Sequence, residues 1–394
     1  MPNSPRSPPS GWRRVRFGDV VRNVNENVRN PLDSELERFV GLDHIDPESL
    51  HIRRWGLIEE GITFTRKFAK GQVLFGKRRA YQRKVAVAEF DGICSGDILV
   101  FEPANADLLP ELLPFIVQSD GFFEHALGTS AGSLSPRTKW KDLARYEFAL
   151  PPKDEQRRIA EILWAADEAI EKQGQSIEAS RSLKASLIGR VFQAGQTDTD
   201  LPDGWQLAAL NDLAEINPKM LKNISDDLAV SFVTMADVSE EGGISNQSEK
   251  QVREVKKGFT YFADDDVLFA KITPCMENGK GALVRGLTNG MGFGSTEFFV
   301  VRPKEKSDAQ FIYYLTMAHP FRQQAKRMMR GSAGQQRVPR EFLEKYVMAV
   351  PSLLERTRLG NLLQGCDRNI EAQKLNLENL KTLKKNLLAK LFHP

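Results

Sequence analysis

The chain is an internal duplication. Residues 143–192 align with residues 343–392 at a constant offset of 200 and without a gap, so that "LPPKDEQRRIAEIL" at 150–163 matches "VPSLLERTRLGNLL" at 350–363. Upstream, at a slightly smaller offset, "GW" at 11–12 matches "GW" at 204–205, and "LFGK" at 74–77 matches "LFAK" at 268–271. A period of about 190 residues is too long for a solenoid. The chain therefore contains two copies of one unit, each a globular region followed by a helix.

The helix that ends each copy has the apolar spacing of a coiled coil. Apolar residues recur at alternating steps of four and three over about five heptads. The helix from Glu155 to Phe192 would be roughly 57 Å long, more than one such domain uses internally. The alternative is a long amphipathic helix on its own domain's core. Because both apolar stripes are narrow and equally long, we predict that the two helices pair through Ile159, Leu163, Ala166, Ile170, Gln173, Ile177, Leu187, Leu359, Leu363, Cys366, Ile370, Gln373, Leu377, Leu380 and Leu387.

Gln173 and Gln373 lie near the midpoints of the two helix patterns. If the helices are antiparallel and related by a pseudo-dyad, we expect these two glutamines to meet and form a polar layer that fixes the register. The alternative is that both lie on the rim.

The globular regions mix strand patterns with helix patterns. Strand-like runs are "KVAVAEF" at 84–90, "DILVFEP" at 97–103, "GALVRG" at 281–286 and "EFFVVRP" at 297–303, and a helical stretch covers 309–329. This predicts a mixed α/β (α+β) domain in each copy. The polar stretch at 193–203 is typical of a linker, and the Pro/Ser-rich residues 1–10 are typical of a disordered leader.

The composition is that of a soluble globular protein, with 41% hydrophobic and 27% charged residues. No apolar run approaches the roughly 20 residues that span a bilayer. Cys94, Cys275 and Cys366 are far apart and odd in number, which fits neither a disulfide framework nor a zinc site. We therefore expect a cytoplasmic protein. The net charge of +3 is too small to indicate a nucleic-acid partner by itself.

The sequence lacks a convincing catalytic motif. "GQVLFGKR" at 71–78 resembles a phosphate-binding loop, but it has Arg78 where the Mg²⁺-binding Ser or Thr belongs, and its apolar centre favours a strand. "GMGFGS" at 290–295 resembles a glycine-rich cofactor loop, but its counterpart "DGICSGD" favours a hairpin turn. The five histidines form no ligand-spaced pair, and methyltransferase and acidic nuclease motifs are missing. We expect a non-catalytic chain without a metal or cofactor of its own.

Positive charge is concentrated in each globular region. Eight Lys and Arg residues stand between residues 66 and 84 with no acid among them, and six more stand between 322 and 340. Such runs are usually solvated faces, but a run in each copy favours DNA, because Lys and Arg neutralise phosphates and Arg and Gln reach base edges. The candidate DNA-binding residues are Lys77, Arg78, Arg79, Arg83, Lys84, Ser130, Arg137, Lys139, Lys271, Lys280, Arg330, Ser332, Gln335, Gln336, Arg337 and Arg340.

Two of these candidates have distinct predicted roles. Arg337 follows "GSAGQQ", where Gly331 and Gly334 permit close backbone approach, so we expect it to contact bases. Lys77 stands in a dense cluster with two arginines, which is better suited to gripping the phosphate backbone.

The two-copy layout and the stretch "LFGKRRAYQRKVAVAEFDGICSGDILVFEP" at 74–103 resemble the specificity subunit of type I restriction-modification enzymes. The resemblance covers residues 12–392. It implies target recognition domains at 11–150 and 204–350, and antiparallel spacer helices at 151–192 and 351–392.

The resemblance also implies the binding of a bipartite, asymmetric double-stranded DNA site. It implies methylation subunits that carry S-adenosylmethionine and restriction subunits that use ATP and Mg²⁺. The second copy has "ITPCMENGK" where the first has "RRAYQRK", which different bases in the second half-site would explain. Two alternatives remain: a duplicated DNA-binding regulator, or the recognition module of a fused methyltransferase or nuclease.

Overall fold

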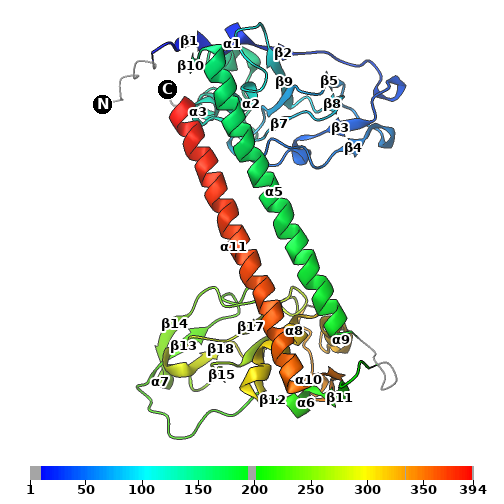
Figure 1. Ribbon diagram of the computed structural model, residues 1–394, viewed down its shortest axis with the longest axis vertical. Coiled ribbons are helices and arrows are strands. Elements are labelled where there is room, and N and C mark those ends of the chain that lie inside the picture. Colours follow the sequence, from blue (N-terminus) through cyan, green and yellow to red (C-terminus); the bar gives the residue numbers. More distant parts are fainter. Residues whose placement is uncertain (1–9, 194–200, 333, 393–394) are drawn as a thin grey trace. The chain divides into compact units, whose positions relative to one another are not determined.

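The protein is described by a computed structural model that covers residues 10–193, 201–332 and 334–392. Most of the expected leader and linker lies outside these residues. The chain divides into two compact units (Figure 1): unit 1 is Met1–Gln175 with Leu375–Pro394, and unit 2 is Ser176–Lys374. Two long helices, α5 (Lys153–Val191) and α11 (Leu353–Phe392), contribute to both units.

Unit 1 holds the first globular region. Its elements before α5 are β1 (Arg13–Arg16), α1 (Phe17–Val20), β2 (Val21–Val24), η1 (Pro31–Asp33), β3 (Arg38–Val40), η2 (Leu42–His44), β4 (Gly56–Leu57), η3 (Ile58–Glu60), β5 (Arg66–Phe68), β6 (Val73–Gly76), η4 (Ala80–Gln82), β7 (Val85–Val87), β8 (Gly92–Cys94), β9 (Ile98–Pro103), α2 (Leu113–Gln118), α3 (Asp120–Gly128), α4 (Trp140–Leu143) and β10 (Glu147–Leu150).

Unit 2 holds the second globular region. Its elements are β11 (Gln206–Ala209), α6 (Leu210–Leu213), β12 (Ala214–Ile216), β13 (Ala229–Val233), β14 (Ser248–Gln251), α7 (Val252–Val255), β15 (Thr260–Ala263), β16 (Val267–Ala270), β17 (Gly281–Leu283), η6 (Thr288–Gly290), β18 (Met291–Gly294), β19 (Phe298–Pro303), η7 (Lys306–Asp308), α8 (Ala309–Met317), α9 (His319–Met328), α10 (Arg340–Lys345) and β20 (Val347–Val350).

The two units have the same sheet topology. The sheet β2-β9-β6-β7 in unit 1 corresponds to β12-β19-β16-β17 in unit 2, β4-β3-β8-β5 corresponds to β14-β13-β18-β15, and the pair β1-β10 corresponds to β11-β20. Neighbouring strands are antiparallel except for β3 with β8 and β13 with β18. The duplication seen in the sequence is thus a duplication of fold, and the expected mixed α/β architecture is confirmed.

The strand patterns predicted from the sequence are also confirmed, as β7, β9, β17 and β19. The stretch that resembles a phosphate-binding loop contains β6, whose four residues are all buried. Its apolar side chains belong to the core, so the backbone cannot form a phosphate cradle there.

The prediction of a hairpin turn at 290–295 is wrong. Residues Met291–Gly294 form β18, a central strand of its sheet. A Cβ at Gly292 would lie 2.3 Å from the Phe262 ring, and one at Gly294 would lie 2.3 Å from the Val233 carbonyl oxygen. These glycines are therefore required by the close approach of neighbouring strands and not by a turn.

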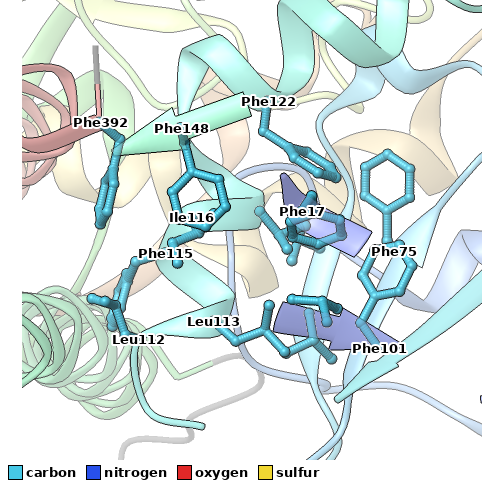
Figure 2. Close-up of a cluster of buried hydrophobic side chains, with 14 of the residues drawn as sticks. Phe17, Phe75, Phe101, Leu112, Leu113, Phe115, Ile116, Phe122, Phe148 and Phe392 are labelled. Atoms are coloured by element: carbon cyan, nitrogen blue, oxygen red, sulfur yellow. The ribbon is translucent and has the colours of Figure 1, made fainter. Parts of the chain in front are cut away.

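The core of unit 1 is closed by both long helices. Ile159 and Leu163 of α5 are buried with aromatic residues of the globular region, and so are Leu388 and Phe392 of α11. Figure 2 shows Phe392 beside Phe148 in this cluster. The C-terminal end of the second copy's helix thus completes the core of the first copy's domain, and both alternatives raised for the helices hold.

Unit 2 repeats the arrangement. Phe192 of α5 and Leu363 of α11 are buried in one cluster with the second globular region, and Phe192 lies 5.0 Å from Phe311 between ring centroids. Each globular region therefore depends on a helix end supplied by the other copy.

We predict that Phe392→Ala lowers the free energy of unfolding of unit 1 by about 3–5 kcal/mol, because it leaves a cavity in the core. Urea unfolding can be followed by tryptophan fluorescence, since four of the five tryptophans lie in residues assigned to unit 1. Leu383→Ala is the matched control, because this α11 side chain is 52% exposed and its loss should cost about 0.5 kcal/mol or less. Equal losses for the two variants would contradict the assignment.

Candidate nucleic-acid interface

Three loops of unit 1 come together around Lys77. They are residues 77–84 after β6, residues 95–97 before β9 and residues 129–139 before α4. The Lys77 N–H donates to the Asp97 carbonyl at 2.9 Å, and the Lys77 carbonyl accepts from Thr138 N–H at 3.1 Å. We call this the three-loop surface of unit 1. It joins segments that are about 20 and 60 residues apart in the sequence.

Unit 2 has the same arrangement around Lys271. Its loops are residues 271–280, 295–297 and 329–339 without 333. The Lys271 N–H donates to the Glu297 carbonyl at 2.9 Å, and the Lys271 carbonyl accepts from Val338 N–H at 2.9 Å. Lys77 and Lys271, Asp97 and Glu297, and residues 138 and 338 therefore occupy equivalent places.

Each three-loop surface contains an arginine paired with a carboxylate. Arg137 donates to Asp97 from Nε at 2.8 Å and from Nη2 at 3.3 Å. Arg337 donates to Glu297 from Nε at 3.0 Å and from Nη2 at 2.8 Å. The hydrogen bond from Arg137 holds the pKa of Asp97 below its usual value, and that from Arg337 does the same for Glu297, in both cases against the effect of burial. Both carboxylates are ionised at neutral pH.

The lysines at the centre of the two surfaces are partly desolvated. Burial, and after it the charge of Arg66, lowers the pKa of Lys77, and burial likewise lowers the pKa of Lys271. A cation that has lost water and faces like charge is stabilised when an anion approaches it.

Several of the sequence-predicted residues meet at these surfaces. Arg78 bonds to Asp97 at 3.4 Å and to Ser135 at 3.1 Å. Arg330 and Arg337 exchange two backbone hydrogen bonds of 2.9 Å. Exposed or half-buried candidates on the same loops are Arg79, Lys139, Ser332, Gln335 and Gln336.

Other predicted residues have their polar atoms engaged inside the protein. The Arg83 guanidinium lies 4.5 Å from the centre of the Phe123 ring and donates to Asp120 at 2.8 Å. Lys84 and Lys280 each donate to a backbone carbonyl, that of Leu42 and that of Met235. Ser130 donates to the Ala126 carbonyl and Arg340 pairs with Glu344 within one helix. These contacts hold loops and helix ends to the domain.

In the folded structure, acidic side chains lie beside the two basic runs. These acids come from other segments, as with Asp97 for Arg78 and Glu277 for Lys326. Arg322 is half-buried and donates to the Met276 carbonyl at 2.5 Å, and desolvation lowers its pKa to about 10. Fewer of these Lys and Arg residues are therefore available to a DNA phosphate than the acid-free sequence runs suggested.

The two carboxylates at the centre of these surfaces, Asp97 and Glu297, are not among the residues predicted from the sequence. A signal was present, because Asp97 and Glu297 each lie two residues after Ser95 and Ser295, which are equivalent in the repeat alignment. Acidic residues are not expected in a phosphate-binding surface, so their equivalence carried no weight without the structure.

Polar contacts join the two long helices within each unit. In unit 1 Lys384 donates to Asp167 at 2.5 Å, and Asn376 donates to Gln173 at 3.1 Å. The partner numbers rise on one helix as they fall on the other, so the helices are antiparallel.

In unit 2 Lys184 donates to Asp367, and Gln373 donates to Ser176 at 3.1 Å. The helices are antiparallel there too. Gln173 and Gln373 thus both bond with the opposite helix, and a direct contact between the two glutamines stays a prediction.

The predicted seam is less apolar than its spacing suggests. Ile177 and Ile370 are buried, whereas Ala166, Ile170, Leu187, Leu359, Cys366, Leu377, Leu380 and Leu387 are only half-buried. Asp167 and Lys384, with side chains 5% and 7% exposed, are buried among them. Ion pairs and amide contacts therefore supply much of the helix pairing within each unit.

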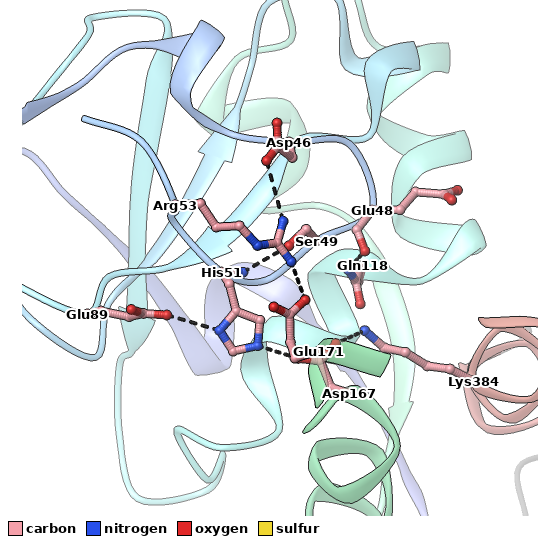
Figure 3. A network of polar contacts seen from close by, with 10 residues as sticks. All are labelled: Asp46, Glu48, Ser49, His51, Arg53, Glu89, Gln118, Asp167, Glu171 and Lys384. Atoms are coloured by element: carbon pink, nitrogen blue, oxygen red, sulfur yellow. Dashed lines mark hydrogen bonds and ion pairs between the residues drawn. The ribbon is translucent and has the colours of Figure 1, made fainter. Parts of the chain in front are cut away.

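A charged network ties the globular region of unit 1 to α5 (Figure 3). His51 bonds to Asp167 at 2.9 Å and to Glu89 at 3.0 Å, and Arg53 pairs with Glu171. The hydrogen bond with Asp167 raises the pKa of His51 to about 9, although burial opposes this. The imidazole is therefore protonated at neutral pH and donates to both carboxylates.

Within residues 10–193, 201–332 and 334–392, His, Cys, Asp and Glu side chains nowhere gather in a group of three or more that could hold a metal ion. Over the same residues, each helix is too short or too polar to span a bilayer.

Comparison with known proteins identifies the sequence pattern. The family model "Type I restriction modification DNA specificity domain" matches residues 9–179 and 202–385. The chain is 36% identical over 226 residues to the Type I restriction enzyme EcoEI specificity subunit of Escherichia coli, which covers 56% of this chain and 37% of that protein. It is 39% identical over 199 residues to the EcoAI specificity subunit of the same species, which covers 49% of this chain and 33% of that protein. The chain thus spans about a third of the length of these relatives.

The fold is also similar to a solved structure. A chain from a study titled "Structural basis underlying complex assembly and conformational transition of the type I R-M system" superposes with a TM-score of 0.59 at 21% identity. The superposition covers 98% of this chain and 99% of that one. At this identity the likeness shows a common fold.

We predict that His51 makes unit 1 less stable as the pH rises into the alkaline range. Its folded pKa of about 9 exceeds the unfolded value of about 6.5. Its contribution is therefore complete below about pH 6.5, declines as the pH rises and is lost above about pH 9. Allowing for partial exposure, the loss should be on the order of 2 kcal/mol.

The measurement is urea unfolding of the wild type and His51→Gln between pH 6 and pH 10. The stability difference between them should shrink across this range. His125→Gln is the control, because that ring bonds to the Asp142 backbone carbonyl instead of to carboxylates. A wild-type to His51→Gln difference that stays constant with pH would refute the prediction.

Proposed function

Because the chain belongs to the type I restriction modification DNA specificity family, we propose that it is a non-catalytic subunit that recognises a bipartite, asymmetric sequence in double-stranded DNA. Each globular region would bind one half-site, and the paired helices would set the spacing between the half-sites. The observation that carries the proposal is the duplicated three-loop surface, with a lysine and a paired arginine at equivalent places in the two units.

The chemistry of these surfaces suits DNA. Lys77 and Lys271 are cations that a phosphate would stabilise, since burial lowers the pKa of each. The guanidinium of an arginine carries donors in a planar fork that matches the O6 and N7 atoms of guanine. Contacts of the lysines with phosphates would position the protein on DNA, and contacts of the arginines with bases would give it sequence specificity.

The partners of the chain follow from the same proposal. Relatives carry the name of type I restriction enzyme specificity subunits. We infer that this chain directs methylation subunits, which bind S-adenosylmethionine, and ATP- and Mg²⁺-dependent restriction subunits to its DNA site. The chain itself would need no cofactor, and it would act in the cytoplasm.

We predict that the half-sites are modular. Exchanging residues 12–148 for the equivalent region of a relative should change one half of the methylated sequence and leave the other half and the spacing unchanged, because each unit has its own three-loop surface. Methylome sequencing of cells with the exchanged and original chains measures this. Loss of both half-sites in a complex that still assembles would contradict the proposal.

We predict different effects for the two kinds of basic residue. Arg337→Ala should cost about 1–3 kcal/mol of binding to the target and relax specificity at one position of the second half-site. Lys77→Ala should weaken binding to all duplexes alike and reduce the salt dependence by roughly one unit.

The measurement is titration of a panel of duplexes at several salt concentrations with the assembled methyltransferase complex. Arg253→Ala serves as a matched control, because this arginine lies on α7, outside the three-loop surface, and pairs with Asp227. Unchanged DNA binding by both test variants would show that these loops are solvated surfaces.

A further inference from the structure

Each proposed DNA-binding surface contains a carboxylate that opposes DNA binding by its charge. The Asp97 side chain is 19% exposed and the Glu297 side chain is 25% exposed, so both carboxylates lie close to the surface. A negative charge beside phosphate-binding cations weakens the attraction for any nucleic acid. Its presence at the same place in both units calls for a compensating role.

The geometry supplies that role. The carboxylate of Glu297 accepts hydrogen bonds from both Nε and Nη2 of Arg337, and Asp97 accepts from the same two nitrogens of Arg137. A two-point contact of this kind fixes the plane of the guanidinium and not only its distance. Nη1 of Arg337 also donates to the Gln335 carbonyl at 3.2 Å, which fixes the guanidinium further, so that its remaining N–H donors point in a set direction.

The backbone of each acidic residue is itself held in place. The N–H of Asp97 donates to the Ser95 hydroxyl at 3.2 Å, and the N–H of Glu297 donates to the Ser295 hydroxyl at 3.2 Å. The carbonyl of each acid accepts the backbone N–H of the central lysine of its surface. The arginine is therefore oriented by a group that is fixed to the turn before β9 or β19.

The two pairs differ in a way that bears on specificity. In unit 1 the shorter Asp97 also accepts from Arg78, whereas in unit 2 the equivalent of Arg78 is Ile272 and the longer Glu297 contacts Arg337. The two units thus share a backbone arrangement, but the acidic side chain that holds the arginine is longer in unit 2 than in unit 1.

We propose that Asp97 and Glu297 are positioning residues, which orient Arg137 and Arg337 for contact with bases. Each carboxylate lowers the overall affinity for DNA and increases the discrimination between sequences. This rests on the proposed function, since it concerns how the DNA-binding surfaces select their half-sites.

A purely stabilising role for these pairs predicts something else. The arginine side chains are 47% and 43% exposed, and ion pairs this exposed add little to folding stability. If stability were their only role, removing the carboxylate would leave sequence discrimination unchanged.

The test is Glu297→Gln in the full chain, assembled with its methylation subunits. Binding is measured for the target duplex, for single-base variants of both half-sites and for an unrelated duplex, at several salt concentrations. We expect tighter binding to the unrelated duplex, because one negative charge is lost. We expect discrimination at one position of the second half-site to fall roughly 5- to 100-fold, with the first half-site unaffected.

Three further variants make the result specific. Asp97→Asn should have the same effect on the first half-site alone. Glu297→Asp keeps the carboxylate and should retain more discrimination than Glu297→Gln. Asp227→Asn is the matched control, because it removes the same charge from an arginine pair elsewhere in unit 2 and should leave discrimination unchanged.

The arginine itself supplies the decisive comparison. In an Arg337→Ala background, Glu297→Gln should cause no additional loss of discrimination, because the carboxylate acts through the guanidinium. Unchanged discrimination in Glu297→Gln alone, or a uniform loss of affinity for all duplexes, would overturn the positioning role. Failure of the wild-type complex to discriminate between duplexes would instead refute the proposed function, and this role with it.

Discussion

A buried ion pair between the long helices is the constraint on which unit 1 depends, and unit 2 has a more exposed version of the same pair. Asp167 and Lys384 are almost fully buried beside the core of unit 1, although they are 217 residues apart in the sequence. A buried ion pair adds little net stability, but leaving one partner alone costs about 3–5 kcal/mol. Sliding one helix by a turn would do this, so the pair sets the register. That register in turn places Phe392 in the domain core.

The duplication keeps this ion pair and changes its surroundings. Lys384 lies 5.5 Å from the centre of the Phe115 ring, and Lys184 lies 5.4 Å from that of Tyr314. In unit 2 the Tyr314 hydroxyl donates to the carboxylate of Asp367, which in unit 1 is the role of the His51 imidazolium. The neutral donor makes the helix pairing of unit 2 independent of histidine titration, whereas unit 1 couples it to the loop that carries His51.

The parts of this structure that could be predicted from the sequence are those set by local patterns. Alternating and heptad periodicities located β9, β19 and the long helices, and the repeat gave the common topology. The carboxylates of the candidate site could not be found in this way, because Asp97 lies 40 residues from Arg137 in the sequence. The glycines of β18 were misinterpreted for the same reason, since the Phe262 ring that requires Gly292 belongs to another strand.

A duplicated scaffold with different loops gives a physical basis for the proposed binding to an asymmetric DNA site. The backbone hydrogen bonds around Lys77 and Lys271 are the same, so both surfaces would approach the DNA backbone in the same way. The side chains beside them differ, with Arg78 replaced by Ile272. A guanidinium and an aliphatic chain cannot favour the same base edge, because one donates hydrogen bonds and the other packs against a thymine methyl group. Two surfaces that dock on DNA in the same way but carry different side chains would therefore be sufficient to recognise two different half-sites.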